Sequence, residues 1–413
     1  MKVWILQTGE PLQIDKGNPR PMRAINLSNK LVEAGHDVVL WSSSFDHQNK
    51  RHRSKGNKVY NVNDQLKIYL IHSFGYKAHI GIGRLIDHFH MAFNLKKWLM
   101  AGSNLPDVVF IGYPPIETAF VMSNWLKIRG IPVLLDVKDL WPSIFIDAFP
   151  KSLKPLAKII FYPYFLMARK IMRDSKGIST MSQGFLNWSL DFSKRKACSN
   201  DKIVRLTSID GEFESEDIIR SEEWWGHIGV YQKTIKVFFV GTFSSAFDFD
   251  QIYLAALKIK HCQFVLCGHG PCFDDIKKKM IGLDNVVFPG WIDRVKMKSL
   301  ADMSIASLAP YKNIENFRLN IPNKIIDSLL LGVPILSPLG GEVQFLLKEN
   351  NVGFTYDDNF TLSHFILKLI DDSKLQLDMS INSKKLYDSE FEFNKVYNGL
   401  VIHLENMSKK SSH

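Results

Sequence analysis

Short apolar runs alternate with amphipathic stretches along almost the whole chain. In the first half, runs rich in β-branched residues predict strands at 2–8, 37–43, 67–73, 107–113, 132–137 and 177–182. The second half repeats this pattern at 236–241, 262–268, 285–290, 303–310, 333–337 and 352–356. Helical spacing of apolar residues between the strands, for example over 21–35 and 117–130, predicts parallel sheets covered by helices.

The alternation continues too far for a single core. A chain of 413 residues is long enough for two domains of roughly 200 residues each. The acidic stretch 207–225 interrupts the pattern and is the predicted linker. We therefore expect an α/β protein with two doubly wound, Rossmann-like domains, over residues 1–210 and 211–390. Residues 391–413 are predicted to form a C-terminal helix that packs back towards the N-terminal domain.

The loops that follow the strands are where chemistry is expected. In open parallel sheets, ligands bind beyond the carboxyl ends of the strands. The segment after the first strand is rich in turn residues, and polar or glycine-rich segments follow the strands at 132–137, 236–241 and 333–337. Two domains with such loops at their sheet edges suggest a binding cleft between them.

Composition limits the cellular compartment and the classes of binding partner that we expect. With 46% hydrophobic residues, both domains can bury a core. The four cysteines are too few for a disulfide framework and suggest a reducing compartment. Three of them lie near His261 and His269 at spacings that match no zinc pattern, so no metal site is expected. The net charge of +10 favours a polyanionic partner, but no zinc-finger, RRM or basic-zipper signature favours nucleic acid.

Lys324 occupies an unusual place in a predicted helix. Proline at position 322 and glycine at position 332 mark the start and the end of that helix. Lys324 therefore lies in the first turn, where unpaired N–H groups already carry about half a positive charge. A phosphate or diphosphate would stabilise this arrangement, and Asp327, one turn later, could accept hydrogen bonds from ribose hydroxyls. The alternative is a solvated lysine beside a surface aspartate.

Several segments together resemble the two-domain GT-B glycosyltransferases. They are GEPLQIDKGNPRPMR, WSSSFDHQ, LLDVKDLWP, FVGTFSSAFD, FVLCGHGP, VVFPGW and IPNKIIDSLLLGVPILSPLGGE, in the expected order between residues 8 and 342. The resemblance is closest to glycosyltransferase family 4 and its bacterial surface-polysaccharide members, of the O-antigen or capsule type. It implies a C-terminal domain that binds a nucleotide sugar and an N-terminal domain that binds an acceptor, facing each other across a cleft.

The resemblance also implies roles for individual residues. Lys324 and Asn323 match the pair beside the donor diphosphate, and Asp327 matches the acidic residue that holds the nucleotide ribose. Gly341 and Glu342 match the loop that closes over the donor.

Further roles are implied in both domains. Gly17, with its neighbour Asn18, matches the glycine-rich loop that faces the diphosphate. Asp139 lies in the segment that faces the donor sugar, and we expect it to act with Lys324 in catalysis. Donor contacts are also expected at Thr242, Ser244 and Gly268, although Thr242 and Ser244 stand where many relatives carry Arg and Lys.

The function implied by the resemblance is retaining transfer of a sugar to a lipid-linked saccharide in polysaccharide biosynthesis. The donor would be a nucleotide sugar, with UDP favoured by family habit, and no metal or cofactor is expected. Three alternatives remain open: a Rossmann oxidoreductase, a nucleotide-sugar epimerase of the same fold, and a non-catalytic membrane-associated assembly protein. The G-x-G pair at 81–85 supports the oxidoreductase only weakly, because it follows no predicted strand.

The segment 151–173 suggests attachment to a membrane. Its apolar run, 159–168, is too short to span a bilayer but suits its interface. The flanking cations that would favour an anionic surface are Lys151, Lys154, Lys158, Arg169, Lys170 and Arg173. A core helix kinked at Pro163 is the alternative. The first residues do not predict a signal peptide, so we expect a cytoplasmic protein peripherally associated with the cytoplasmic face of the inner membrane.

Overall fold

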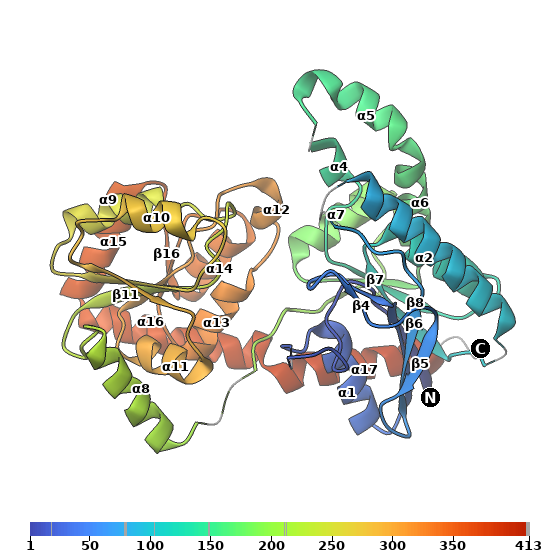
Figure 1. Cartoon of the computed structure of the whole chain (residues 1–413), viewed down its shortest axis with the longest axis horizontal. Coiled ribbons are helices and arrows are strands. Elements are labelled where there is room, and N and C mark those ends of the chain that lie inside the picture. Colours follow the sequence, from blue (N-terminus) through green and yellow to red (C-terminus); the bar gives the residue numbers. More distant parts are fainter. Residues whose placement is uncertain are drawn as a thin grey trace. The chain divides into compact units, whose positions relative to one another are not determined.

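Two α/β units make up the chain (Figure 1). The computed structural model describes residues 1–17, 19–77, 81–102, 104–147, 149–209, 211 and 213–409. Unit 1 comprises Met1–Arg205 and Asn394–His413, and unit 2 comprises Leu206–Phe393. The division falls between residues 205 and 206, and the C-terminal segment groups with unit 1.

Unit 1 is built on one mainly parallel sheet. Its strands are β1 (Lys2–Leu6), β2 (Asp37–Ser43), β5 (Lys58–Asn61), β6 (Leu66–Ile71), β7 (Val108–Tyr113), β8 (Val133–Val137), β9 (Gly177–Thr180) and β10 (Lys202–Ile203). They follow the order β10-β9-β8-β7-β1-β2-β6-β5, in which β5 alone runs antiparallel to its neighbour. A short hairpin, β3 (Phe45–Asp46) and β4 (Arg51–His52), lies outside the sheet. The chain winds outwards in both directions from β1, so the switch point lies between β1 and β7.

Helices cover both faces of this sheet. They are α1 (Arg23–Glu33), α2 (Ile82–Ala101), α3 (Ile116–Lys127), α4 (Ser143–Asp147), a 3₁₀ turn (Lys151–Leu153), α5 (Lys154–Ile160), α6 (Tyr162–Asp174), α7 (Gln183–Ser193) and α17 (Phe393–Lys409). Apolar residues of α2, α3 and α6 form one core with β1, β7 and β8. Helices α1 and α17 lie on the opposite side of the sheet (Figure 1).

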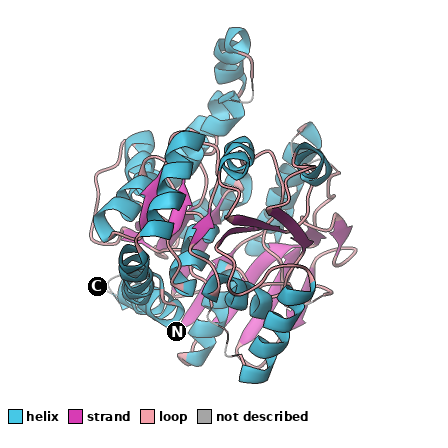
Figure 2. Cartoon of the chain, turned by 90° about the vertical axis from the view of Figure 1, so that its left-hand side faces the viewer, coloured by secondary structure: helices cyan, strands magenta, loops and turns pink. Residues whose placement is uncertain are grey.

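Unit 2 contains a second, fully parallel sheet. Its strands are β11 (Lys236–Val240), β12 (Gln263–Cys267), β13 (Val286–Gly290), β14 (Ala306–Leu308), β15 (Ile335–Ser337) and β16 (Gly353–Thr355). Their order is β13-β12-β11-β14-β15-β16, which puts the switch point between β11 and β14. Figure 2 shows strands flanked by helices, the doubly wound arrangement that the sequence predicted.

The helices of unit 2 also pack on both faces of their sheet. They are α8 (Ser215–His227), α9 (Asp250–Lys258), α10 (Phe273–Lys279), α11 (Arg294–Asp302), α12 (Glu315–Arg318), α13 (Asn323–Leu331), α14 (Glu342–Asn350), α15 (Asn359–Asp371), α16 (Ser373–Leu386) and a π-helical turn (Tyr387–Phe391). One core joins β11 and β12 to α9, α10 and α15. On the other face, Phe238 and Val265 pack against α8 and α11.

The prediction of an irregular linker over 207–225 was wrong for its second half. Residues 215–227 form α8, because one side of this acidic stretch is buried. Trp225 is fully buried, and its indole Nε1 donates to the hydroxyl of Ser299 at 3.1 Å. Because charged residues on the exposed side outnumber the buried apolar ones, the sequence pattern did not indicate a helix here.

The C-terminal helix packs on unit 1. Its buried face includes Tyr397, whose hydroxyl accepts a hydrogen bond from Asn26 of α1 at 3.4 Å. Glu405 pairs with His36 at 2.8 Å. The chain therefore returns to unit 1 after completing unit 2.

A buried ion pair joins helix α1 to strand β8. Nη1 of Arg23 donates to Oδ1 of Asp136 at 2.7 Å, and the two side chains are 3% and 0% exposed. Nη2 of Arg23 donates to the carbonyl of Val204 at 2.7 Å. The hydroxyl of Ser179 donates to Asp136 at 2.9 Å. The pair thus connects α1 with β8, with β9 and with the residue that follows β10.

A second ion pair closes the first long loop. Nζ of Lys138 donates to Oε1 of Glu10 and lies 3.6 Å from Oδ2 of Asp136. The N–H of Ala24 donates to Oε2 of Glu10 at 2.8 Å. Burial alone would raise the pKa of Glu10, but the charge and hydrogen bond of Lys138, with the bond from Ala24, lower it. Glu10 therefore stabilises the fold above its unfolded pKa, and this stabilisation is lost as the pH falls through the lowered pKa.

Replacing Asp136 with asparagine would leave the guanidinium of Arg23 buried without a countercharge. We expect Asp136→Asn to lower the free energy of unfolding by about 3 kcal/mol, as measured by urea denaturation. Asp147→Asn is the matched control, because the side chain of Asp147 is 66% exposed and pairs with Lys154. Its expected loss is below about 1 kcal/mol. Equal losses in the two variants would contradict a special role for the buried pair.

Candidate active site

Most of the predicted donor-binding residues lie at the carboxyl edge of the unit 2 sheet. Thr242 and Ser244 follow β11, Gly268 follows β12, and the remaining ones begin α13 and α14. Helix α13 comes after β14, so its first turn lies at the switch point between β11 and β14. Crevices at such points bind ligands in open parallel sheets.

Lys324 reaches from α13 to the end of β11. Its Nζ donates to the carbonyl of Val240. The ammonium lies 4.5 Å from the ring centre of Phe239 and 5.2 Å from that of Phe247, within the range of cation–π attraction. A Cβ on Gly241 would come within 1.8 Å of this Nζ. Glycine at 241 therefore leaves the space that the lysine occupies.

The environment of Lys324 favours the loss of its proton. Burial lowers its pKa to about 8, although the charge of Asp327 acts in the opposite direction. The lysine also lies in the first turn of α13, whose N-cap residue Pro322 makes no side-chain hydrogen bond, so the positive end of the helix dipole lies beside the ammonium. A partly desolvated cation beside a helix N-terminus is well suited to bind an anion.

Asp327 lies one turn further along α13 and is half-buried. Its charge, together with burial, raises the pKa of Tyr311, a residue of the loop after β14. Asn323 is the first residue of α13 and is exposed. The structure thus places Asn323, Lys324 and Asp327 on one helix end, with Tyr311 beside them.

Backbone groups line the other strand ends. Gly268, with φ of +126°, packs against the backbone of residue 241, where a Cβ would meet the carbonyl oxygen at 1.9 Å. Thr242 is exposed, and the hydroxyl of Ser244 accepts from the N–H of Ala246 at 3.4 Å. The loops after β11 and β12 are therefore in direct contact.

Arg318 is a cation that the sequence analysis missed. Gly341 precedes α14 with φ of +67°, and a Cβ there would lie 2.3 Å from the carbonyl oxygen of Arg318. Nε of Arg318 lies 3.4 Å from the corresponding position on Gly340. Its side chain forms no ion pair with any residue that the structure describes. Arg318 therefore lies beside Gly341, which precedes the half-buried Glu342 at the start of a second helix.

The predicted residues of unit 1 lie on two loops of its own sheet. Gly17 lies in the loop after β1, with φ of +89° and open space where a Cβ would be. Asn18 lies outside the described residues. Asp139 follows β8 and is half-buried. Burial raises its pKa, against the opposing effects of the Leu140 N–H and the charge of Arg84.

A cavity of about 230 Å³ lies at the carboxyl edge of unit 1. It is lined by residues that follow β1, β2, β7 and β8 and by the first half of α2, among them His47, Arg84 and Lys138. His88 also lines it; its Nδ1 lies 3.5 Å from Oε2 of Glu117, and both side chains are buried. Its buried carboxylate partner was not apparent from spacing.

Comparison with solved structures supplies the fold family. Sucrose-phosphate synthase from Thermosynechococcus elongatus has 12% sequence identity and a TM-score of 0.68, with 97% of each chain covered. Anabaena HepE in complex with UDP has 12% identity and a TM-score of 0.65, covering 98% of this chain and 99% of that one. WaaG, a glycosyltransferase involved in lipopolysaccharide biosynthesis, has 12% identity and a TM-score of 0.64, with 98% and 99% covered.

The chain has the GT-B fold. No protein-family model and no curated protein sequence matches it. The likeness to other GT-B structures therefore lies in the arrangement of strands and helices over nearly the full length. Membership of glycosyltransferase family 4 stays a prediction.

No group of three or more His, Cys, Asp or Glu side chains among the described residues is placed to hold a metal ion. Within the same residues, every helix is too short or too polar to cross a bilayer. In this GT-B chain, Cys262 and Cys267 are buried free thiols, and burial raises the pKa of Cys262 to about 12.

The lowered pKa of Lys324 predicts an effect on stability. The folded protein binds the lysine proton more weakly than the unfolded chain does, so the unfolding free energy due to Lys324 rises between about pH 8 and 10.5. Lys324→Met removes the buried charge. We expect it to stabilise the protein by about 1–2 kcal/mol at neutral pH, with a gain that shrinks above pH 8.

Denaturant unfolding across this pH range measures the gain. The exposed Lys312, replaced by methionine, is the control and should have no pH-dependent effect in this window. Destabilisation by Lys324→Met at neutral pH would show that the lysine is held by favourable contacts instead.

Proposed function

We propose that this protein is a glycosyltransferase that transfers a sugar from a UDP-sugar to a lipid-linked saccharide in cell-surface polysaccharide biosynthesis. The observation that carries the proposal is Lys324, half-buried at the N-terminus of α13 and at the switch point of the unit 2 sheet. The GT-B structures similar to this chain include HepE with UDP-glucose and WaaG. A nucleotide-sugar donor would account for a cation, a helix N-terminus and the carboxylate of Asp327 on one helix end.

The proposed reaction requires stabilisation of the negative charge that develops on the leaving group. Sugar transfer proceeds through an oxocarbenium-like transition state while negative charge grows on the departing nucleoside diphosphate. Lys324 and the N–H groups of α13 lie where they would stabilise that charge. Arg318 and the start of α14 would supply a second positive region. We propose that these groups act without a bound metal, and that the anomeric configuration is retained.

The cavity of unit 1 is the proposed acceptor site. Its lining combines cations with aromatic rings: the guanidinium of Arg84 lies 5.8 Å from the ring centre of Tyr76, which also lines the cavity, and 5.0 Å from that of Trp141 behind it. Such a site can hold a polar saccharide between hydrogen-bonding groups and ring faces. Asp139, whose pKa is raised, would contact the reacting sugar from the adjoining loop.

Thermal shift with UDP, GDP, CMP and dTDP tests the function. UDP at about 100 times its dissociation constant should stabilise the protein by about 2.7 kcal/mol. Asp327→Asn should weaken UDP binding, because an amide accepts hydrogen bonds less well than a carboxylate. Lys324→Ala should lower sugar transfer on the order of 100-fold, and more than it lowers UDP affinity. Lys312→Ala is the charge-matched control. Absence of a shift with every nucleotide would refute the proposal.

The lipid-linked acceptor rests on an exposed apolar surface of unit 1. Along α2, the exposed residues Ile82, Ile86, Phe89 and Phe93 recur at helical spacing. Helices α5 and α6 add Leu156, Ile159, Ile160, Tyr162 and Leu166, with exposures between 49% and 73%. The rings of Phe89 and Tyr164 are 5.9 Å apart, which joins the two groups. We call these nine exposed residues the apolar ridge.

Charge and shape make an anionic membrane the proposed partner of the ridge. Helices α4 and α5 extend away from the rest of unit 1 (Figures 1 and 2). The exposed Lys151 and Lys158 flank the apolar residues of α5, where each cation near an anionic surface contributes about 1 kcal/mol. The core-helix interpretation of 151–173 holds for its second half, and attachment of the exposed first half to a membrane is a proposal. Ala168, Ile171 and Met172 are core residues, whereas the first half of the segment is exposed.

Flotation with anionic liposomes tests this attachment. We expect salt-sensitive binding at low ionic strength that is lost when Lys151, Lys154 and Lys158 are all changed to glutamate. Ile159→Asp should also weaken binding, because it places a charge among the apolar contacts. The matched control changes three exposed lysines of α10, Lys277, Lys278 and Lys279, to glutamate. Equal loss in both triple variants would show that net charge alone governs binding.

A further inference from the structure

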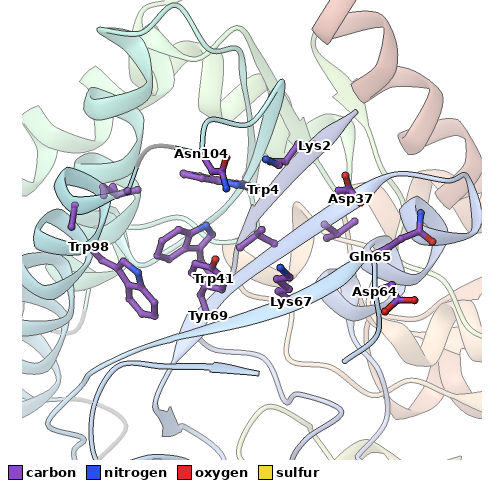
Figure 3. Close-up of a pocket in the computed structure, with 15 residues that line it drawn as sticks. Lys2, Trp4, Asp37, Trp41, Asp64, Gln65, Lys67, Tyr69, Trp98 and Asn104 are labelled. Carbon is purple, nitrogen blue, oxygen red and sulfur yellow. The ribbon is translucent and has the colours of Figure 1, made fainter. Parts of the chain in front are cut away.

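A cavity of about 500 Å³ lies in unit 1, away from the proposed acceptor site. Strands β1, β2 and β6 form its floor, and the end of α2 forms one wall (Figure 3). Lys2 and Asp37 are the first residues of their strands, and Lys67 is the second residue of β6. The cavity therefore opens at the amino edge of the sheet, whereas the proposed acceptor site lies at the carboxyl edge.

Four aromatic side chains build one side of this cavity. Trp41 is central: its ring lies 5.2 Å from Trp4, 4.8 Å from Tyr69 and 5.2 Å from Trp98. Tyr69 and Trp98 stack at 5.1 Å with an interplanar angle of 17°. Trp4 and Trp41 are buried, whereas Tyr69 and Trp98 are half-buried. Mutual packing fixes the orientation of all four rings.

One buried donor of this cluster lacks a partner. Nε1 of Trp41 makes no hydrogen bond to any described residue, although the side chain is only 2% exposed. An unsatisfied buried donor costs on the order of 1–3 kcal/mol. Trp41 lines the cavity with its ring, whereas Nε1 itself is covered by protein atoms, so a ligand would contact the ring and not this donor.

The rim offers hydrogen bonds of both kinds. Lys2 and Lys67 carry donors, Asp37 carries acceptors, and Gln65 and Asn104 carry both. Figure 3 shows these polar side chains around the aromatic cluster. Because the rim contains both signs of charge, it does not select strongly for an anion or a cation. Burying an apolar ligand there would leave polar groups without partners.

We propose that this cavity, which we call the aromatic groove, binds a neutral saccharide chain. A sugar ring has apolar C–H faces that can pack on the exposed parts of Trp98 and Tyr69, and a border of hydroxyls that can both donate and accept. The volume lies within the range of about 300–1,000 Å³ typical of ligand sites. The inference rests on the proposed transferase function, for which the groove would hold part of a saccharide acceptor or product away from the site of transfer.

Titration of protein labelled with ¹⁵N at its tryptophans tests the groove. The probes are maltotriose, cellotriose and tri-N-acetylchitotriose, each up to about 10 mM, where affinities of about −4 kcal/mol are detected. We expect at least one probe to shift the indole N–H signals of Trp41 and Trp98, assigned by single Trp→Phe variants. The signal of Trp291, which is 64% exposed in unit 2, should not move.

Variants separate the groove from the rest of the protein. Trp98→Ala should weaken binding of the responding probe at least about tenfold, whereas Trp291→Ala should not. If Trp98→Ala lowers the melting temperature, Lys67→Ala and Gln65→Ala test the rim without removing a core ring. No response to any probe, or unchanged affinity in the rim and ring variants, would overturn the proposal. A concentration-dependent dimer that Trp98→Ala abolishes would assign the groove to a second copy instead.

The same samples distinguish this inference from the proposed function. Trp98→Ala should retain the UDP-induced thermal shift, because Trp98 belongs to unit 1 and to the amino edge of its sheet. UDP binding without saccharide binding would refute the groove and leave the transferase proposal standing. Saccharide binding without any nucleotide binding would refute the transferase and leave a carbohydrate-binding groove.

Discussion

The buried pair of Arg23 and Asp136 is the interaction on which the functional edge of unit 1 depends. It fixes the start of α1 against β8, and the neighbouring pair of Glu10 and Lys138 fixes the long loop after β1. Removing one charge from such a set leaves its partner desolvated and uncompensated. The four groups therefore hold together the loops that carry Gly17 and Asp139 and line the proposed acceptor cavity.

Unit 2 holds its principal cation in a different way. Lys324 faces a carbonyl and two aromatic rings rather than a carboxylate in direct contact, and burial lowers its pKa. We expect this arrangement to cost stability, as is common where a site is organised for a ligand. Because the ammonium is partly desolvated, an incoming diphosphate would interact with it more strongly than in water. The glycine at 241 makes this position of the side chain possible.

The lipid-linked saccharide proposed as the substrate would use two surfaces of unit 1. The apolar ridge of α2, α5 and α6 exposes side chains that a core would normally bury, with lysines beside them. The aromatic groove lies at the amino edge of the sheet and combines fixed rings with a polar rim. In these proposals the ridge adjoins the acceptor cavity along α2, whereas the groove lies at the opposite edge of the sheet. Binding energy from such remote contacts can support catalysis through positioning.

The sequence by itself determined the local elements, and the tertiary structure decided which of them meet. Apolar periodicity located every long parallel strand. The Pro322 and Gly332 signals placed Lys324 in the first turn of α13. Both predictions succeeded because these patterns reflect interactions between residues close together in the chain. The same patterns missed the antiparallel strand β5 and helix α8. The buried side of α8 is fixed by contacts distant in sequence, such as the hydrogen bond from Trp225 to Ser299. The patterns could not reveal the pair of Arg23 and Asp136, which are 113 residues apart, nor the aromatic groove, which is assembled from three strands and a helix. Such contacts follow from the strand order and the packing of helices on each sheet. The free energy that fixes strand order and packing is distributed over both hydrophobic cores, so no single segment of sequence reveals it.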